Sequence, residues 1–299
     1  MDNKKIGVLA VLAAALMWAI EPIVAKIAYR TAEPLQTFTI RTAVIALIAA
    51  VYIIITNKGN FKVTKKQFPK LVYLAVVGTL VADLFYYLAF KHVAVLNSVI
   101  IGHIQPVFVV LIGFFILKED KVNRFDYAGI IAMIIAALMV TTKTMTNLIN
   151  LNFGTIGDLF VLIAAVSWAT TTIVARKYLK GVNAGVITFY REVIALIFLV
   201  GYLVYTASLS ISNFYQILVG IIVGVGTILY YEGLNRMKAA QVSALELASP
   251  FFAASLGFLI LGEKVTIMQI LGIGILCFGI YLLSKKEREI SNIARQPPQ

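Results

Sequence analysis

Several ionisable side chains stand inside long apolar segments, where a charge is costly. They are Glu21, Arg41, Asp83, Arg191, Glu192, Glu232 and Glu246. A charged side chain at the centre of a membrane-spanning helix costs about 2.5–3.5 kcal/mol on insertion scales, so such residues are candidates for function. A guanidinium can hold a carboxylate or phosphate through two parallel hydrogen bonds, and a buried carboxylate can hold an amine or carry a proton. Snorkelling arginines and helix–helix bonds are the structural alternative.

Polar and aromatic residues recur near these charges at helical spacing. Asp83 is followed by Tyr86 at i+3 and Tyr87 at i+4, and such rings can stack on a planar or cationic solute or simply pack in a core. Glu21 precedes Pro22, which frees a backbone carbonyl and can bend a helix. The predicted solute-binding set is Glu21, Trp18, Arg41, Asp83, Tyr86, Tyr87, His103, Gln105, Trp168, Thr171, Arg191, Tyr230, Tyr231 and Glu246.

The residue types offer little for metal, redox or nucleophilic chemistry. Cys277 is the single cysteine, and His92 and His103 are the two histidines, in no metal-ligand pattern. The sequence therefore predicts no catalytic residue, no metal site and no cofactor. It favours a protein that is not an enzyme, with a membrane-embedded enzyme or a passive channel as weaker alternatives.

Membrane-spanning helices must position these residues. Of the 299 residues, 61% are hydrophobic and 13% are charged, against about a quarter charged in soluble domains. One soluble core could not bury this much apolar surface, so a cytosolic enzyme is excluded. A spanning helix needs about 20 apolar residues. The apolar runs predict an all-α integral membrane protein with ten transmembrane helices, near residues 6–28, 35–56, 69–90, 94–117, 124–142, 156–178, 184–206, 213–234, 240–261 and 266–284.

The basic residues predict an orientation in the membrane. The net charge is +12, but Lys and Arg occur in short clusters between apolar runs, so the expected partner is the lipid bilayer and no nucleic acid. The two ends of the chain and the loops after spans 2, 4, 6 and 8 lie on one side of the membrane and hold 19 of the 26 basic residues. The loops on the other side hold five, and Arg41 and Arg191 lie inside spans. The positive-inside rule then places both termini in the cytoplasm of a multi-pass protein of the plasma (inner) membrane.

An internal repeat organises the chain. Residues 7–26 and 157–176 are identical at 11 of 20 positions, and Arg41 falls on Arg191 at the same offset. Each copy holds five spans, an odd number, so the second copy enters the membrane from the opposite side. This predicts two inverted five-helix repeats around a central cavity, an arrangement typical of secondary transporters. The predicted units are residues 1–147, residues 148–284, and a cytoplasmic, disordered tail at residues 285–299.

Motifs in both halves resemble the EamA-type transporters of the drug/metabolite transporter superfamily. Those in the first half are Trp18 with Lys26, Arg41, the stretch 86–93 and Pro106, and those in the second half are the stretches 230–234, 250–253 and 259–264. The resemblance covers about residues 6–284. It implies the inverted-repeat fold, and a cavity lined mainly by spans 1, 3, 4, 6, 8 and 9. Many members of the family export or exchange small metabolites.

Together, these observations predict a secondary active transporter that exports a small-molecule solute by alternating access. The solute is expected to be amino acid-like or another small polar or amphipathic metabolite, and the proton is a candidate coupling ion. A multidrug or cationic-compound exporter is the alternative. Arg41 and Arg191 each lie roughly 9 Å along the helix from a span start, near opposite surfaces, so structure or gating is favoured for them over direct solute contact.

Overall fold

The structure, a computed structural model, describes residues 3–105, 108, 111–112, 124–150, 154–179, 182–236, 245 and 248–293. This part of the chain is helical and contains no strand. The helices are α1 (Asn3–Ala28), α2 (Pro34–Thr56), α3 (Phe68–Tyr73), the π-helix η1 (Leu74–Asp83), α4 (Leu84–Ala89), α5 (Val95–Gly102), α7 (Arg124–Thr142), α8 (Met145–Ile149), α9 (Ile156–Tyr178), α10 (Ala184–Tyr205), α11 (Tyr215–Arg236), α13 (Ala248–Leu261) and α14 (Ile267–Ile293).

These helices fit a multi-pass membrane protein. Five continuous helical segments are long and apolar enough to cross a bilayer, and they are Lys5–Ala28, Pro34–Thr56, Phe68–Ala89, Ile156–Ala175 and Ala184–Tyr205. Shorter apolar helices cover Tyr127–Ala136, Tyr215–Tyr230 and Ile267–Gly279. Many large apolar side chains on them face outward, as a lipid-facing surface requires. Each of the ten predicted spans contains at least part of a described helix.

Local sequence explains where several helices begin. Proline at position 34 is the first residue of α2, where its missing N–H costs nothing. Thr155 caps α9, since its hydroxyl accepts from Asp158 N at 3.3 Å and its own N–H donates to the Asp158 carboxylate at 2.6 Å. The Asn183 side chain accepts from Gly185 N at 2.9 Å and so caps α10.

The two halves run through the bundle in opposite directions. Lys26, near the end of α1, pairs with Glu263 at 3.0 Å, and Glu263 accepts the N–H of Val95 at the start of α5 at 2.9 Å. Asp158, at the start of α9, accepts from Asn97 in the first turns of α5 at 3.3 Å. The end of α1 and the start of α9, its counterpart in the repeat, therefore share one end of the bundle. We call this the Lys26 end.

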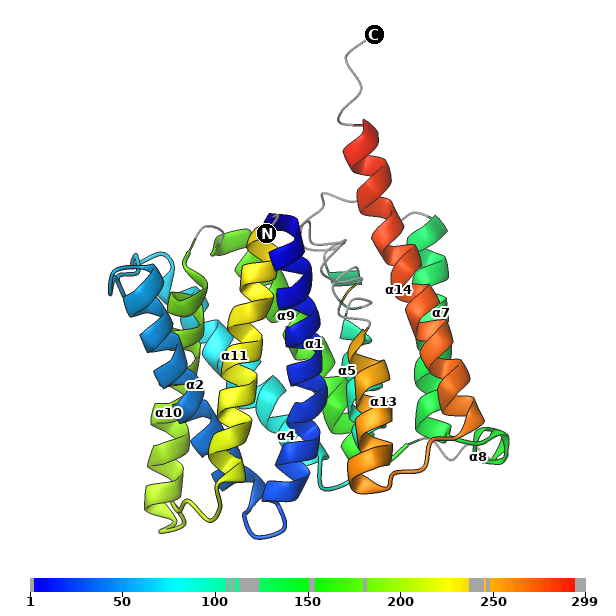
Figure 1. Ribbon diagram of the computed structural model, residues 1–299, viewed down its shortest axis with the longest axis horizontal. Helices are drawn as coiled ribbons and strands as arrows, with labels where there is room; N and C mark the ends of the chain where they lie inside the picture. The colour runs from blue at the N-terminus through cyan, green and yellow to red at the C-terminus, as the bar shows by residue number, and fades with distance from the viewer. Residues whose placement is uncertain are drawn as a thin grey trace.

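The opposite end of the bundle is the Tyr52 end, named after a residue close to the end of α2. The start of α1 and the end of α14 both lie there (Figure 1). Helix α2 packs between α10 and α11, and α11 packs against α1, so segments from the two halves alternate in space. Helices α7 and α14 pack against each other at the side of the bundle (Figure 1).

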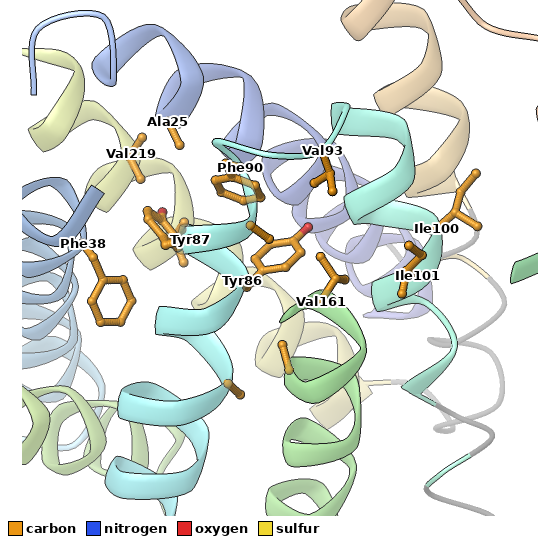
Figure 2. Close-up of a cluster of buried hydrophobic side chains, with 14 of the residues drawn as sticks. Ala25, Phe38, Tyr86, Tyr87, Phe90, Val93, Ile100, Ile101, Val161 and Val219 are labelled. Carbon is orange, nitrogen blue, oxygen red and sulfur yellow. The ribbon is translucent and has the colours of Figure 1, made fainter. Parts of the chain in front are cut away.

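The main apolar core joins side chains from both halves. Tyr86, Tyr87 and Phe90 of the third span belong to one buried cluster with Val161 of α9 and Val219 of α11 (Figure 2). Glycines let helices of opposite halves approach closely. A Cβ at Gly220 of α11 would lie 2.6 Å from Val44 Cβ of α2, so only glycine fits this contact.

One expectation about the tail is wrong. The sequence predicts disorder from Lys285 onward, but α14 continues to Ile293. The residues from Ser284 to Ile293 lack proline and glycine and include several strong helix formers, so the apolar span can extend as a polar helix. Residues 294–299 lie outside the described part of the chain.

Candidate solute-binding site

A cavity of about 310 Å³ lies between the two halves. Side chains from α1, α2, η1, α4, α5, α9, α10, α11 and α13 line it, so most of the described helices contribute. It extends to Ala175 in the last turns of α9 and Ile187 in the first turns of α10, which places it toward the Tyr52 end. From the predicted set, the lining residues are Trp18, Glu21, Arg41, Asp83, Tyr86, His103, Gln105, Trp168, Thr171, Arg191 and Tyr230.

Three predicted residues stand apart. Tyr87 does not line the cavity but lies fully buried behind it, where its hydroxyl donates to Glu21 Oε1 at 2.9 Å. Tyr231 belongs to α11, but its side chain is outside the described part of the structure, as is the whole of Glu246. Tyr87 is therefore a residue that holds Glu21 in place.

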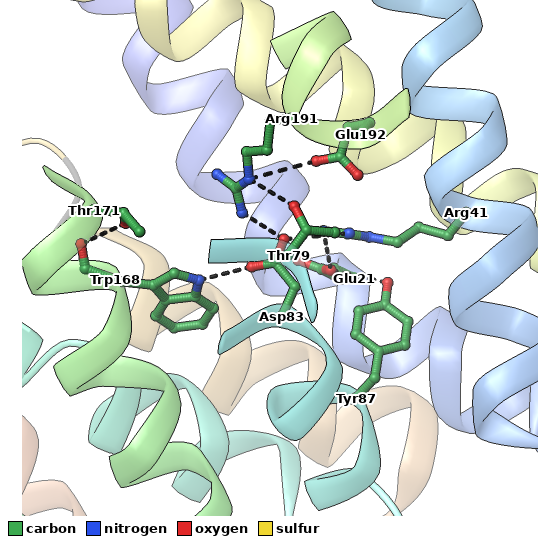
Figure 3. A network of polar contacts seen from close by, with 9 residues as sticks. All are labelled: Glu21, Arg41, Thr79, Asp83, Tyr87, Trp168, Thr171, Arg191 and Glu192. Atoms are coloured by element: carbon green, nitrogen blue, oxygen red, sulfur yellow. Dashed lines mark hydrogen bonds and ion pairs between the residues drawn. The ribbon is translucent and has the colours of Figure 1, made fainter. Parts of the chain in front are cut away.

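Asp83 is the shared partner in a buried network of charges (Figure 3). Its Oδ2 lies 2.5 Å from Arg191 Nη2 and 3.5 Å from Arg41 Nη1, and its Oδ1 accepts from Trp168 Nε1 at 2.7 Å. Asp83 is 5% exposed. A carboxylate at this depth needs such partners, because burying an unpaired charge is costly.

The two arginines meet in one network. The sequence-based expectation that they lie near opposite surfaces is wrong for their charged groups, because each long side chain extends from its backbone to the same carboxylate. Arg191 Nε also donates to Thr79 Oγ1 at 2.8 Å. Arg41 pairs with Glu21 at 3.6 Å, and its guanidinium lies over the rings of Phe38 and Tyr87, at 5.3 and 5.1 Å from their centroids.

A cavity enclosed by two inverted halves, with paired charges at its wall, has the form of a transporter site. The model of the EamA-like transporter family matches this sequence at residues 5–142 and 155–285. The chain belongs to this family. It is therefore a membrane transporter.

Curated relatives of this EamA-like transporter also carry transporter names. An uncharacterized transporter of Synechocystis sp. is 28% identical over 74% of this chain and 66% of its own length. Uncharacterized transporters of Clostridium kluyveri and Archaeoglobus fulgidus are 27% and 25% identical, over 88% and 90% of this chain and 88% and 95% of their own lengths. A crystal structure with 14% identity superposes with a TM-score of 0.66 over 94% of this chain and 98% of the other, which shows a shared fold.

The predicted solute-binding set leaves out several residues that line the cavity of the transporter. Glu192 is the most important of them, because it is 3% exposed and its Oε1 lies 3.7 Å from Arg191 Nε. It is among the ionisable residues that the sequence places inside spans, but it was not included in that set. The other lining residues with polar side chains that were missed are Thr172, Thr188, Thr227 and Ser249.

The charges of the network do not balance. Glu21, Asp83 and Glu192 supply three carboxylates against two guanidiniums, which leaves a formal charge of −1 when all five groups are ionised. Among the residues that the structure describes, no group of three or more His, Cys, Asp or Glu side chains is placed to hold a metal ion. The excess negative charge can be offset by a cationic solute or by a proton.

Two aromatic pairs flank the cavity in a pseudo-symmetric manner. Trp168 of the second half packs edge-to-face against Tyr86 of the first, with an interplanar angle of 68°. Trp18 of the first half packs at a tilt of 50° against Tyr230 of the second, and the ring centroids of each pair are 5.1 Å apart. Trp18 and Trp168 are repeat mates at the offset of 150 residues. Further along the repeat the offset is 144 residues, so that Tyr86 and Tyr87 align with Tyr230 and Tyr231. The pairs cross the boundary between the halves, so they combine a solute-facing surface with packing at the repeat interface.

The π-helix η1 positions the side chain of Arg191. A Cβ at Gly78 would lie 3.3 Å from both Cζ and Nε of Arg191, so glycine lets the guanidinium lie against the helix backbone. Thr79 and Asp83, which follow on the same helix, bind that guanidinium. Single π-type turns are frequent at functional sites. Here the wider helix brings backbone, hydroxyl and carboxylate to one arginine.

Proposed function

We propose that this EamA-like transporter is a secondary carrier for a small polar or amphipathic metabolite and works by alternating access. The observation that carries the proposal is the network Arg41–Asp83–Arg191, which joins one inverted half to the other at the wall of a cavity. A solute that contacts these groups changes the balance of interactions between the halves. Solute binding and movement of the halves are then energetically linked.

The bundle is closed at the Lys26 end in the conformation observed. Three contacts tie the halves there, and they are Lys26–Glu263 at 3.0 Å, Asn213 Nδ2 to Ala28 O at 2.9 Å, and Gln36 Nε2 to Ser208 O at 2.7 Å. The cavity extends toward the other end. With the termini in the cytoplasm of a plasma (inner) membrane, as the basic residues favour, this is an inward-facing form and the carrier loads solute for export.

Orientation can be tested with an impermeant thiol reagent. Cys277 is the single cysteine, so a Cys277→Ser background accepts one new cysteine at a time. Lys58 and Lys91 are exposed in connections at opposite ends of the bundle. In intact cells, Lys91→Cys should react from outside and Lys58→Cys only after permeabilisation. The reverse pattern would contradict the export direction and the assignment of the termini.

A cationic-compound exporter is the second candidate. The excess negative charge of the network favours it, together with the two Trp–Tyr pairs, because aromatic faces and carboxylates attract cations. In both candidates the polar groups of the cavity bind a solute, and we assign no catalytic role to any of them.

Solute transport is the direct test of the carrier. Thermal-shift screening of the solubilised protein against amino acids, nucleotides, sugars and cationic dyes selects a ligand. Counterflow of that ligand in proteoliposomes should then saturate, whereas a conductive, non-saturating flux would indicate a channel. If a proton is the coupling ion and Glu21 carries it, Glu21→Gln should flatten the pH dependence of transport. An unchanged pH profile would remove Glu21 as the proton carrier.

A further inference from the structure

Lysines without carboxylate partners stand at the Tyr52 end of the bundle. They lie in the connection between α2 and α3, at the start of α3 and in the last turn of α9, and they are Lys58, Lys62, Lys65, Lys66, Lys70 and Lys177. The sequence has no Asp or Glu at residues 34–82 or 159–191. Within the part of the chain that the structure describes, none of these lysines forms an ion pair. They are therefore open to an anion from outside the chain.

Two of these lysines meet at one aromatic ring. Lys70 Nζ lies 4.8 Å from the centroid of the Tyr178 ring, and Lys177 Nζ lies 5.5 Å from the same centroid. Lys70 belongs to the first half and Lys177 to the second, so the packing of the halves brings the two ammonium groups together. The face of an aromatic ring attracts each cation, but the cations repel each other. A phosphate removes this repulsion and accepts hydrogen bonds from both.

The backbone that carries these lysines is held in place by the second half. Tyr190 OH of α10 donates to the carbonyl oxygen of Phe61 at 3.1 Å, and the ring of Phe68 packs edge-on against Tyr190 with centroids 6.4 Å apart. The neighbouring Leu71 and Leu179 are buried in one apolar cluster. An anion that binds here does not have to order the chain first, which favours binding.

The two ammonium groups lie where membrane-spanning segments meet the headgroup layer. Lys70 is in the first turn of the segment Phe68–Ala89, and Lys177 is in the last turn of α9. The side chains of Phe68 and Tyr178 are 46% and 48% exposed, and exposed aromatic rings at the ends of spans are typical of the membrane interface. A soluble anion meets only the ammonium groups here. A phospholipid meets the ammonium groups with its phosphate and the exposed rings with its glycerol and upper acyl chains.

The fold itself does not require lysines at this place. The corresponding connection of the second half, residues 206–214, contains no charged residue. The positive-inside rule explains why basic residues are numerous on one side of the membrane, but not why two of them converge on one ring. We propose that Lys70, Lys177 and Tyr178 form a binding site for the phosphate of an anionic phospholipid headgroup. None of the three lines the cavity, so the site does not depend on the identity of the transported solute.

A comparison of lipids on the unaltered, full-length protein in detergent tests the site, with native mass spectrometry as the readout. Dioleoyl phosphatidylglycerol and dioleoyl phosphatidylcholine share their acyl chains and differ in headgroup charge. We expect the phosphatidylglycerol to bind roughly tenfold more tightly or better, because each basic residue near an anionic lipid headgroup contributes about fivefold. Equal affinity for the two lipids would overturn the proposal. Glycerol phosphate and a polyglutamate peptide are the soluble anions, and binding of either as tight as that of phosphatidylglycerol would refute a lipid site.

A pair of double variants separates a defined site from a diffuse positive surface. Lys70→Gln with Lys177→Gln should weaken the binding of phosphatidylglycerol by roughly tenfold or more. Lys58→Gln with Lys62→Gln is the matched control, because it removes the same charge from exposed positions of the same connection, and neither lysine lies over a ring among the described residues. The control should change the affinity by less than about threefold, since its lysines are outside the site. Equal weakening by the two double variants would show a diffuse surface and refute the site.

Discussion

Arg191 Nη2 lies 2.5 Å from Asp83 Oδ2, and this ion pair connects α10 of the second half with the π-helix η1 of the first. The repeat does not reproduce it. Arg41 is the mate of Arg191, but the position in α11 that corresponds to Asp83 is Thr227. In the alternating-access cycle proposed above, α11 therefore offers Arg41 no carboxylate at the position that corresponds to Asp83. We expect the Asp83–Arg191 pair to stabilise the observed conformation more than the opposite one.

Loss of the Asp83 carboxylate should be strongly destabilising. Asp83→Asn removes the carboxylate that both buried arginines share and leaves them only the longer ion pairs with Glu21 at 3.6 Å and Glu192 at 3.7 Å. Removal of one partner from a buried pair costs about 3–5 kcal/mol. For a chain of this size that corresponds to a fall in melting temperature of roughly 5 °C or more. Thermal unfolding of the purified protein in detergent measures it.

A double variant separates the ion pair from other effects of the substitution. Asp83→Asn with Arg191→Gln removes both charges, so its melting temperature should be higher than the sum of the two single losses predicts. Strictly additive losses would show that the 2.5 Å contact contributes no coupling.

Substitution of Gly78 should impair transport more than stability. The new methyl group in Gly78→Ala would lie 3.3 Å from Arg191 Cζ and 3.4 Å from Thr171 Cγ2, so the guanidinium must shift away from η1. We expect the maximal rate of counterflow to fall severalfold, with a small change in melting temperature. Gly201→Ala is the control, because a Cβ there has no neighbour within 4 Å and alanine favours the helix by up to about 1 kcal/mol. Equal counterflow rates for Gly78→Ala and Gly201→Ala would contradict the role of Gly78 in letting the Arg191 guanidinium lie against η1.

The two tryptophans, although repeat mates, should respond differently to substitution. Trp168 Nε1 donates to Asp83 Oδ1 at 2.7 Å, whereas Trp18 Nε1 faces α11, where a Cβ at Gly226 would lie 3.4 Å away. Trp168→Phe keeps an aromatic ring against Tyr86 but removes the donor, so it should slow transport and lower the melting temperature. Trp18→Phe should have the smaller effect on both, in the same counterflow and unfolding assays. Similar effects of the two substitutions would mean that the ring contacts, and not the bond to Asp83, explain why both repeats have a tryptophan at this position.

Much of the fold and part of the site followed from the sequence. Apolar runs separated by charged and turn-forming residues located the spans, because a helix needs about 20 apolar residues to cross a bilayer. Charged residues inside these spans identified Glu21, Arg41 and Asp83 as candidates for the site. The meeting of Arg41 and Arg191 was not predictable, because it depends on where long side chains extend after the helices pack. The π-helix η1 was missed as well, since its wider turns have no sequence pattern distinct from an apolar α-helix.

The ion pair between Lys26 and Glu263 should act as a closure of the Lys26 end. It is largely buried, with side-chain exposures of 21% and 17%, and Glu263 also accepts the Val95 N–H. Lys26→Gln weakens this closure. In a Cys277→Ser, Thr171→Cys background, labelling of the cavity cysteine by an impermeant maleimide from the Lys26 side should become severalfold faster. Lys91→Gln removes a pair with exposures of 42% and 70%, which contributes little, so labelling should stay at the background rate. If the two lysine variants label at the same rate, the buried pair does not control access from that side.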